Sequence, residues 1–286
     1  MYRLIRIARI IISLIAMAVP TWALIAGYES VFVRMQILTA LLSGVSVTLL
    51  FWALVTIIYG RLYCSTVCPL GTLMDCVSST SRLVRRKSQA YRYRPPSRKT
   101  RLVFLLLTLL FLLSGTTIIP TLLDPYSAYA RMVKEFLAIP FGKAEAPVRF
   151  ALATFAVAGV TAVTVVAVSW KHGRLLCNTV CPIGTVLGYG SRRPYFHFEI
   201  DPDRCINCGE CERVCKSGCI KLPEKTIDHS RCVVCFDCVT VCPNAAITYK
   251  NGRYRLDMPM MRRVQTSGPS LRTTAPQQNS VTCSKK

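Results

Sequence analysis

Four long apolar stretches, separated by polar segments, dominate the first two thirds of the chain. They run over residues 7–26, 37–59, 102–119 and 148–170, and none carries an ionisable residue near its middle. About 20 apolar residues in a helix cross the ~30 Å hydrocarbon core of a bilayer, so the pattern predicts a bundle of four transmembrane helices. Ion and proton paths through such a bundle need buried acids, bases or histidines, and we expect no such path here.

The pattern changes near residue 195. Residues 196–250 mix short apolar runs with cysteines and charges, and the chain then becomes polar and rich in Ser, Thr and Gln. We therefore expect a four-span membrane domain over 1–195, a small soluble α+β domain over 196–250, and a polar, disordered tail over 251–286. The overall balance of 52% hydrophobic and 17% charged residues is typical of a membrane protein with a smaller soluble part.

A repeat relates the two halves of the predicted membrane domain. Residues 60–72, GRLYCSTVCPLGT, match residues 173–185, GRLLCNTVCPIGT. Each copy directly follows an even-numbered apolar stretch. This arrangement predicts two parallel two-helix units, related by an axis along the membrane normal.

Basic residues gather beside the apolar stretches. The chain has 36 Lys and Arg against 14 Asp and Glu. The segment between positions 61 and 101 contains ten of the basic residues and a single acid, Asp75. The positive-inside rule places this segment and both termini in the cytoplasm, which predicts a multi-pass protein of the bacterial inner membrane. Because the charge lies at the ends of the spans rather than on a soluble face, we expect the bilayer, and not nucleic acid, as its partner.

The first stretch also has features of a secretory signal peptide. It has a basic start, and Ala16-Met17-Ala18 loosely fits a cleavage site. The apolar run nevertheless continues to Ala26. We therefore expect an uncleaved anchor, and cleavage would still leave the second stretch running inward.

Eight of the 15 cysteines form two runs with the same spacing, C-x2-C-x2-C-x3-C. This spacing binds [4Fe-4S] clusters, and in two-cluster ferredoxins the last cysteine of each run ligates the other cluster. The spacing thus predicts a two-cluster bacterial ferredoxin-like domain over 196–250. The predicted ligands of cluster one are Cys205, Cys208, Cys211 and Cys242, and those of cluster two are Cys232, Cys235, Cys238 and Cys215.

The first run departs from the usual pattern after its last cysteine. Lys216 stands where proline is usual, and its positive charge beside cluster two should make that cluster easier to reduce. Cys219 follows shortly afterwards, either as a small buried residue or as a spare ligand. The sequence assigns no role to Cys76 or Cys283.

The repeat carries four more cysteines, Cys64, Cys68, Cys177 and Cys181, in two C-x3-C-P motifs. Residues i and i+4 share a helix face, and proline suits the first turn of a following helix. Four thiols brought together by the repeat axis would suit a third cluster. The alternatives are a redox-active dithiol in each copy and small buried residues at a helix junction. Arg61 and Arg174 would stabilise thiolate or cluster charge, or anchor the span ends at lipid headgroups.

The four spans, the two C-x3-C-P motifs and the two cysteine runs together resemble the NapH family of membrane iron–sulfur proteins, the C-terminal half of NosR-type proteins and CcoG-type membrane ferredoxins. The resemblance covers roughly residues 1–250. It implies that the chain takes electrons from quinol and passes them to another redox protein or subunit. It also implies that the four repeat cysteines and the eight later cysteines are the cofactor-binding residues.

We therefore expect a membrane-bound iron–sulfur protein that transfers electrons between the quinone pool and a redox partner. It would act as a quinol dehydrogenase subunit or as a simple carrier, because no flavin, haem-attachment or nucleotide motif is present. The alternative function is assembly of a respiratory metalloenzyme, for example by reducing a metal ion.

A helix predicted from Asp124-Pro125 onward is a further candidate site. Its apolar residues recur at helical spacing, which is typical of a helix lying in the outer membrane interface. It would either roof a quinone pocket, with Asp124, Tyr126 or Glu135 accepting protons, or serve only as an interfacial anchor.

Overall fold

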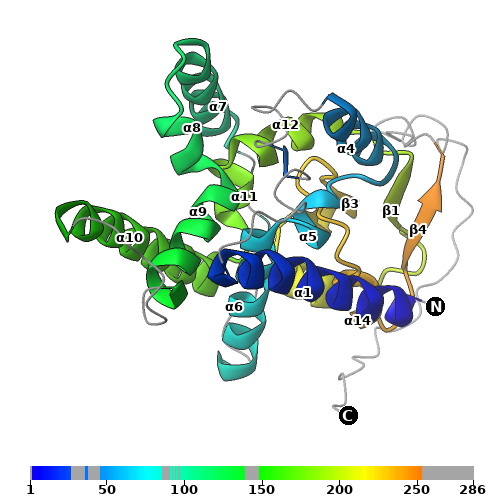
Figure 1. The fold of residues 1–286 in the computed structure, drawn as a ribbon. Helices are drawn as coiled ribbons and strands as arrows, with labels where there is room; N and C mark the ends of the chain where they lie inside the picture. The colour runs from blue at the N-terminus through cyan, green and yellow to red at the C-terminus, as the bar shows by residue number, and fades with distance from the viewer. Residues whose placement is uncertain are drawn as a thin grey trace, which may run out of the picture. The chain divides into compact units, whose positions relative to one another are not determined.

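The computed structural model describes residues 2–26, 36–37, 46–85, 91, 93, 95, 97–138 and 148–252 (Figure 1). The predicted tail beyond residue 252, with Cys283, and residues 38–45 of the second apolar stretch lie outside the described residues. Met1–Tyr254 form one compact unit. The boundary at 195/196 therefore stays a prediction.

The first part of the chain is helical. Its elements are α1 (Tyr2–Ala26), α4 (Ser46–Tyr59), α5 (Tyr63–Thr66), α6 (Pro69–Arg85), α7 (Arg98–Leu113), α8 (Ile118–Leu123), α9 (Pro125–Val133), the π-helical turn η1 (Lys134–Ala138), α10 (Val148–His172), α11 (Leu175–Thr179) and α12 (Pro182–Gly190). The helices α4, α5 and α6 of the first repeat copy correspond in order to α10, α11 and α12 of the second. The repeat read from the sequence is thus a repeat of structure.

Two helices in the described part of the chain are long and apolar enough to cross a membrane. They are α1 and the segment Leu152–His172 of α10. The described part of the second apolar stretch, α4, has 14 residues. The third apolar stretch ends as helix α7 at Leu113, before the turn at 114–115, and is therefore shorter than predicted.

The last part of the chain is a small α+β module. Its elements are β1 (Phe196–Ile200), α13 (Glu210–Val214), β2 (Ile220–Lys221), the 3-10 helix η3 (Leu222–Glu224), β3 (Thr226–Ile227), α14 (Asp237–Val241) and β4 (Ile247–Asn251). Strand β1 pairs antiparallel with β4, with Phe198 opposite Tyr249, and β2 pairs antiparallel with β3. Phe198, Ile220 and Ile247 are among the buried side chains of its core. The cysteine runs lie in the loops and in the short helices α13 and α14 that surround this core.

Helix α9 begins as the sequence predicts, and part of its apolar face is covered by protein. Asp124 is its N-cap and Pro125 its first residue. Its apolar side chains Tyr129, Met132 and Val133 are buried in the same core as Cys64, Cys68 and Cys177. Phe136 and Leu137, which continue the apolar pattern in η1, are 42% and 43% exposed. A position of this helix in the outer membrane interface therefore stays a prediction.

Candidate iron–sulfur sites

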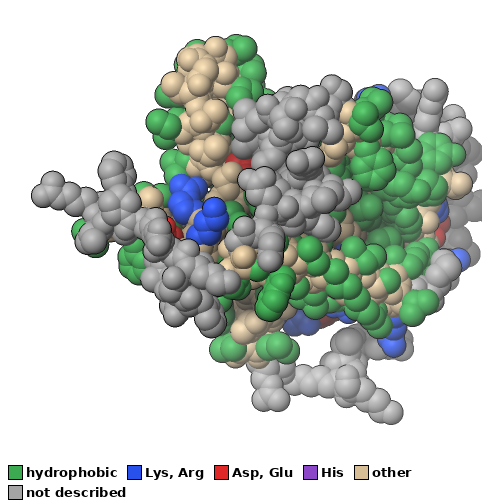
Figure 2. All heavy atoms as spheres, viewed as in Figure 1, with side chains coloured by type: hydrophobic (Ala, Val, Ile, Leu, Met, Phe, Trp, Pro, Cys, Tyr) green, Lys and Arg blue, Asp and Glu red, His purple; other side chains and the backbone are tan. Residues whose placement is uncertain are grey.

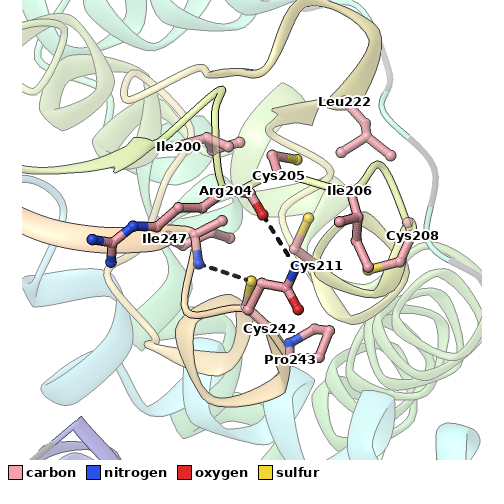
Figure 3. Close-up of a pocket in the computed structure, with 13 residues that line it drawn as sticks. Ile200, Arg204, Cys205, Ile206, Cys208, Cys211, Leu222, Cys242, Pro243 and Ile247 are labelled. Carbon is pink, nitrogen blue, oxygen red and sulfur yellow. Dashed lines mark hydrogen bonds between the residues drawn. The ribbon is translucent and has the colours of Figure 1, made fainter. Parts of the chain in front are cut away.

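The predicted ligands of cluster one surround a single cavity. Its lining includes Cys205, Cys208, Cys211 and Cys242, with Ile200, Leu222 and Ile247 around them (Figure 3). Cys211 comes from α13, whereas Cys242 follows α14 and belongs to the second run. The backbone N–H of Ala246 donates to Cys242 Sγ at 3.2 Å. The structure thus brings together three cysteines of the first run and the last cysteine of the second run, as the ligation pattern of two-cluster ferredoxins requires. Their binding of iron stays a prediction.

The thiols of cluster one influence one another electrostatically. Burial and, to a smaller extent, the charges of Cys208, Cys205 and Cys242 raise the pKa of Cys211 to about 11, although a backbone hydrogen bond from Glu212 lowers it. Four thiolates cannot share such a space unless a cationic centre compensates them. The donor set therefore fits an iron–sulfur core, which binds cysteine as thiolate.

The predicted ligands of cluster two also lie together, deeper in the protein. Burial raises the pKa of Cys238 well above its usual value, and the charges of Cys235, Cys232 and Cys215 act on it as well. The apolar side chains of Val233, Val234 and Phe236 are buried between these cysteines. This site therefore has the dry surroundings that control cluster potential.

Both cysteine runs wind in the same unusual way. The residues on either side of the second cysteine have positive φ, namely Asn207 (55°) and Gly209 (80°) in the first run and Val234 (53°) and Phe236 (61°) in the second. A β-branched residue such as Val234 rarely adopts this conformation. Strain of about 1–3 kcal/mol persists only where the surroundings impose it. The shared winding indicates that the two runs are built to hold the same kind of group.

The unassigned cysteines have different surroundings. Cys219 is buried, and its Sγ lies 3.4 Å from Cys215 Sγ, so this residue adjoins cluster two. Cys76 is exposed. Of these two cysteines, which belong to the described part of the chain, Cys219 is the one that lies beside a predicted ligand.

The four cysteines of the repeat converge on one buried site, which we call the four-cysteine site (Cys64, Cys68, Cys177 and Cys181). Burial raises the pKa of Cys68 well above its usual value, and the charges of Cys177, Cys64 and Cys181 act on it in that order. The second cysteine of each motif lies just beyond its short helix, rather than on it. Pro69 and Pro182 begin the following helices, as predicted.

Two buried arginines join the repeat copies crosswise. Arg61 Nη2 donates to the carbonyl oxygen of Cys177 at 3.2 Å and lies 3.9 Å from Cys64 Sγ. Arg174 Nη1 donates to the carbonyl oxygen of Cys64 at 2.6 Å. Both residues are 0% exposed, which leaves them no surface for lipid headgroups. Their positive charges therefore lie inside the protein, beside the thiols.

The backbones of the repeat also approach closely at this site. A Cβ atom on Gly184 would lie 2.3 Å from the carbonyl oxygen of Cys177 and 2.7 Å from Arg61 Nη2. Only glycine fits there without displacing a cysteine. The close packing of the two repeat copies therefore explains the glycine at position 184, which the sequence alone did not explain.

No three His, Cys, Asp or Glu side chains in the described ranges are arranged to hold a single metal ion. Around one zinc ion the thiolates sit about 2.3 Å from the metal, so their sulfurs are crowded together. The spacing C-x2-C-x2-C-x3-C along the chain is instead that of [4Fe-4S] binding.

An apolar cavity of about 470 Å³ opens beside the four-cysteine site. Helices α8, α9, α10 and α11 contribute to its walls, and Cys177 and Cys181 line it. Two of its few polar groups are Thr161 and Thr164 of α10. Sequence reasoning missed these threonines, because a threonine within an apolar stretch gives no signal of its own.

Asp124 adjoins this cavity, because its chain neighbours Leu123 and Pro125 line it. Its Oδ2 accepts hydrogen bonds from Ser127 N at 2.7 Å and Ser127 Oγ at 2.9 Å. Its Oδ1 is buried and has no hydrogen-bond partner within the described part of the chain. Burial raises the pKa of this carboxyl to about 6. Its charge also acts on the thiol of Cys181.

Comparison with known protein families finds 4Fe-4S binding domains in two parts of the chain. A family model described as a 4Fe-4S binding domain matches residues 41–89 and 152–198, which contain the four-cysteine site. A second model with the same description matches residues 197–220, which contain the first cysteine run.

Two curated proteins are similar to parts of the chain. One is the methylamine utilization ferredoxin-type protein MauN of Paracoccus denitrificans, 28% identical over 196 residues, which are 68% of this chain and 61% of that protein. The other is the uncharacterized protein MJ0749 of Methanocaldococcus jannaschii, 39% identical over 49 residues, which are 17% of this chain and 20% of that protein. The chain thus spans less than two thirds of either relative, and no solved structure matches it. The matched models show 4Fe-4S binding domains in this chain, and one of the proteins similar to it is a ferredoxin-type protein.

Proposed function

We propose that this protein oxidises a membrane quinol bound in the apolar cavity and passes the electrons to a soluble redox protein. The observation that carries the proposal is that Cys177 and Cys181 line the cavity. An electron donor bound there would touch the four-cysteine site directly. The proposal makes the chain one component of a relay.

The size and lining of the cavity suit a quinol. At about 470 Å³, the cavity falls within the range of about 300–1,000 Å³ that is usual for small-molecule sites, and its lining is mostly apolar. The hydroxyls of Thr161 and Thr164 donate to carbonyl oxygens of their own helix at 2.7 Å, so they would accept hydrogen bonds from the hydroxyls of the quinol. Val160, which also lines the cavity, is 69% exposed, so a lipid-soluble molecule would enter beside α10.

Asp124 is the proposed proton acceptor. Quinol oxidation releases protons as well as electrons, so a base must lie near the electron acceptor. The buried Oδ1 of Asp124 is available, and its charge reaches Cys181. The sequence offered Asp124, Tyr126 and Glu135 as proton acceptors, and the buried location of Asp124 beside the cavity favours Asp124. Tyr126 is buried beside it, and burial raises the pKa of its hydroxyl.

We propose that the four-cysteine site holds a third [4Fe-4S] cluster, in addition to the two of the ferredoxin-like module. When bound, such clusters accept and donate single electrons. Around the third site, the guanidinium groups of Arg61 and Arg174 would offset the negative charge of a thiolate-bound cluster. Cys208 and its neighbour Ile206 are exposed, so a redox partner would dock at cluster one.

The proposed setting is the bacterial inner membrane, with the spans forming a four-helix bundle and both termini in the cytoplasm. Apolar side chains that face outward on α1 and α4, such as Ile11, Leu50 and Leu54, support contact with lipid (Figure 2). Arg9 of α1 donates to the carbonyl oxygen of Ser65 beside the four-cysteine site at 3.3 Å. This bond supports the proposal that α1 is an uncleaved anchor rather than a removed signal peptide.

The cavity can be tested by filling it. Val160→Trp should slow reduction of the clusters by a quinol analogue several-fold, because the indole would occupy the volume that the ring requires. Val163→Trp is the matched control, since Val163 lies on the same helix with the same 69% exposure but does not line the cavity. The measurement is anaerobic bleaching of the visible iron–sulfur absorbance in reconstituted protein. Failure of every quinol to bleach the wild type, or equal slowing in both variants, would reject the proposal.

The proton acceptor predicts a dependence on pH. Asp124 accepts a proton only as carboxylate, and its pKa is about 6, so quinol oxidation should accelerate as the pH rises through about 6 and level off above it. Asp124→Asn should lower the rate by about 10²-fold, the lower end of the effect of a general base, and remove this inflection. Chemical reduction by dithionite should be unchanged in the variant. An inflection near pH 6 that survives in Asp124→Asn would assign it to another group.

A further inference from the structure

A chain of buried charges connects the four-cysteine site to the ferredoxin-like module. Arg174 Nε lies 2.8 Å from Asp75 Oδ1. Lys216 Nζ lies 3.6 Å from Asp75 Oδ2 and 3.3 Å from Asp237 Oδ2. The side chains of these four residues are at most 12% exposed. Lys216 thus bridges two acids from different parts of the fold.

The backbone makes the same connection. The N–H of Arg174 donates to the carbonyl oxygen of Lys216 at 2.9 Å. Gly173 has a φ of +61°, and a Cβ atom there would lie 2.4 Å from that oxygen. Asn178 Nδ2 donates to the carbonyl oxygen of Ser217 at 3.2 Å. The loop after Cys215 is therefore fixed against the second repeat copy.

Each end of the charge chain adjoins predicted cluster ligands. Arg174 precedes Cys177 and binds the carbonyl oxygen of Cys64, whereas Lys216 directly follows Cys215 and Asp237 directly precedes Cys238. The charges reach the sulfurs as well. Burial and then the charge of Asp237 raise the pKa of Cys235, whereas the charge of Lys216 lowers it, and the balance is a pKa of about 12.

The outer partners of the two acids are arginines. Arg9 pairs with Asp75 at 3.5 Å, and Arg6 and Arg82 pair with Asp237 at 2.7 and 3.8 Å. Burial alone would raise the pKa of Asp75, yet the charges of Arg174 and then Lys216 hold it well below its usual range. Asp75 is therefore held ionised beside Lys216, and Lys216 is the cation common to Asp75 and Asp237.

We propose that Lys216 is a positioning residue that couples cluster two to the four-cysteine site, so that its one positive charge sets the reduction potentials at both. A cation beside a cluster favours the reduced, more negative form, and inside a protein such a charge is weakly screened. The proline usual after the last cysteine of such a run carries no charge and would not make this bridge. The inference depends on the iron–sulfur chemistry and not on the quinol, so it stands if another molecule is the electron donor.

The experiment is a mediated redox titration of the purified, cluster-loaded full chain, followed by EPR. Lys216→Met should lower the ratio of reduced to oxidised cluster two at a fixed potential by about tenfold, equivalent to 59 mV for one electron, and should lower the ratio at the four-cysteine site by a smaller factor. Lys216→Arg should keep both potentials. Lys221→Met is the matched control, because Lys221 lies in the same module but pairs with the surface residue Glu224, and it should change neither.

A second variant distinguishes charge from packing. Asp237→Asn removes a negative charge and should raise the potential of cluster two. Its partner Arg6 is 39% exposed and can turn to water, so this variant tests the proposal even if Lys216→Met does not fold. The double variant Lys216→Met/Asp237→Asn should return cluster two toward the wild-type potential. Shifts of the same sign in both single variants, or wild-type potentials in Lys216→Met, would overturn the proposal.

Discussion

Replacing Cys68 and Cys181 together with serine should lower the iron content from about twelve atoms per chain to about eight and lower the acid-labile sulfide equally. One cysteine is removed from each repeat copy. Both residues belong to the four-cysteine site, and the charges of Cys177 and Cys64 act on each of them. Serine is a poor ligand for iron in place of a thiolate, so the third cluster should be lost while the ferredoxin-like module keeps its two.

The same double variant should no longer be bleached by quinol, although dithionite should still reduce its remaining clusters. The proposed electron entry point adjoins the cavity, so its loss cuts off clusters one and two without unfolding them. Cys76→Ser is the matched control, because Cys76 is exposed and does not belong to the four-cysteine site. This variant should keep about twelve irons. A wild-type protein with about eight irons would instead favour redox-active dithiols in the repeat.

The cysteine spacing was sufficient to predict which thiols come together. Cys242 was grouped with Cys205, Cys208 and Cys211 although it belongs to the other run, and these four line one cavity. The convergence of the repeat cysteines followed from the repeat itself, because two equivalent copies meet at equivalent positions. Such predictions succeed where a spacing rule already encodes geometry.

Contacts between distant segments were not predictable in this way. The sequence placed Asp124 on the opposite side of the membrane from Cys181, yet α9 packs into the core around the four-cysteine site. The crosswise bonds of Arg61 and Arg174 depend on how the two copies face each other, and spacing along the chain does not contain that orientation. The bridge made by Lys216 was equally hidden, although the missing proline marked the position as unusual.

Arg174 is the residue whose loss should cost the most stability. Its Nε binds Asp75 at 2.8 Å, Nη1 binds the carbonyl oxygen of Cys64 at 2.6 Å, and Nη2 binds that of Gly71 at 3.2 Å. Arg174→Met would remove all three bonds and leave the carboxylate of Asp75 without its nearest cation. Removing one partner of a buried ion pair costs about 3–5 kcal/mol. We expect a loss of this size in the free energy of unfolding, measured by denaturant titration in mild detergent.

Two further variants separate charge from geometry in this prediction. Arg174→Lys keeps the cation but not the planar group that binds three acceptors at once, so it should recover only part of the lost stability. Arg174→Met combined with Asp75→Asn should be less harmful than the sum of the single changes, because no unpaired carboxylate remains. Arg192→Met, which removes an exposed arginine stacked on Tyr189, should cost less than about 1 kcal/mol. If Arg174→Met proved no more harmful than Arg192→Met, the crosswise arginines would not be what holds the two repeat copies together.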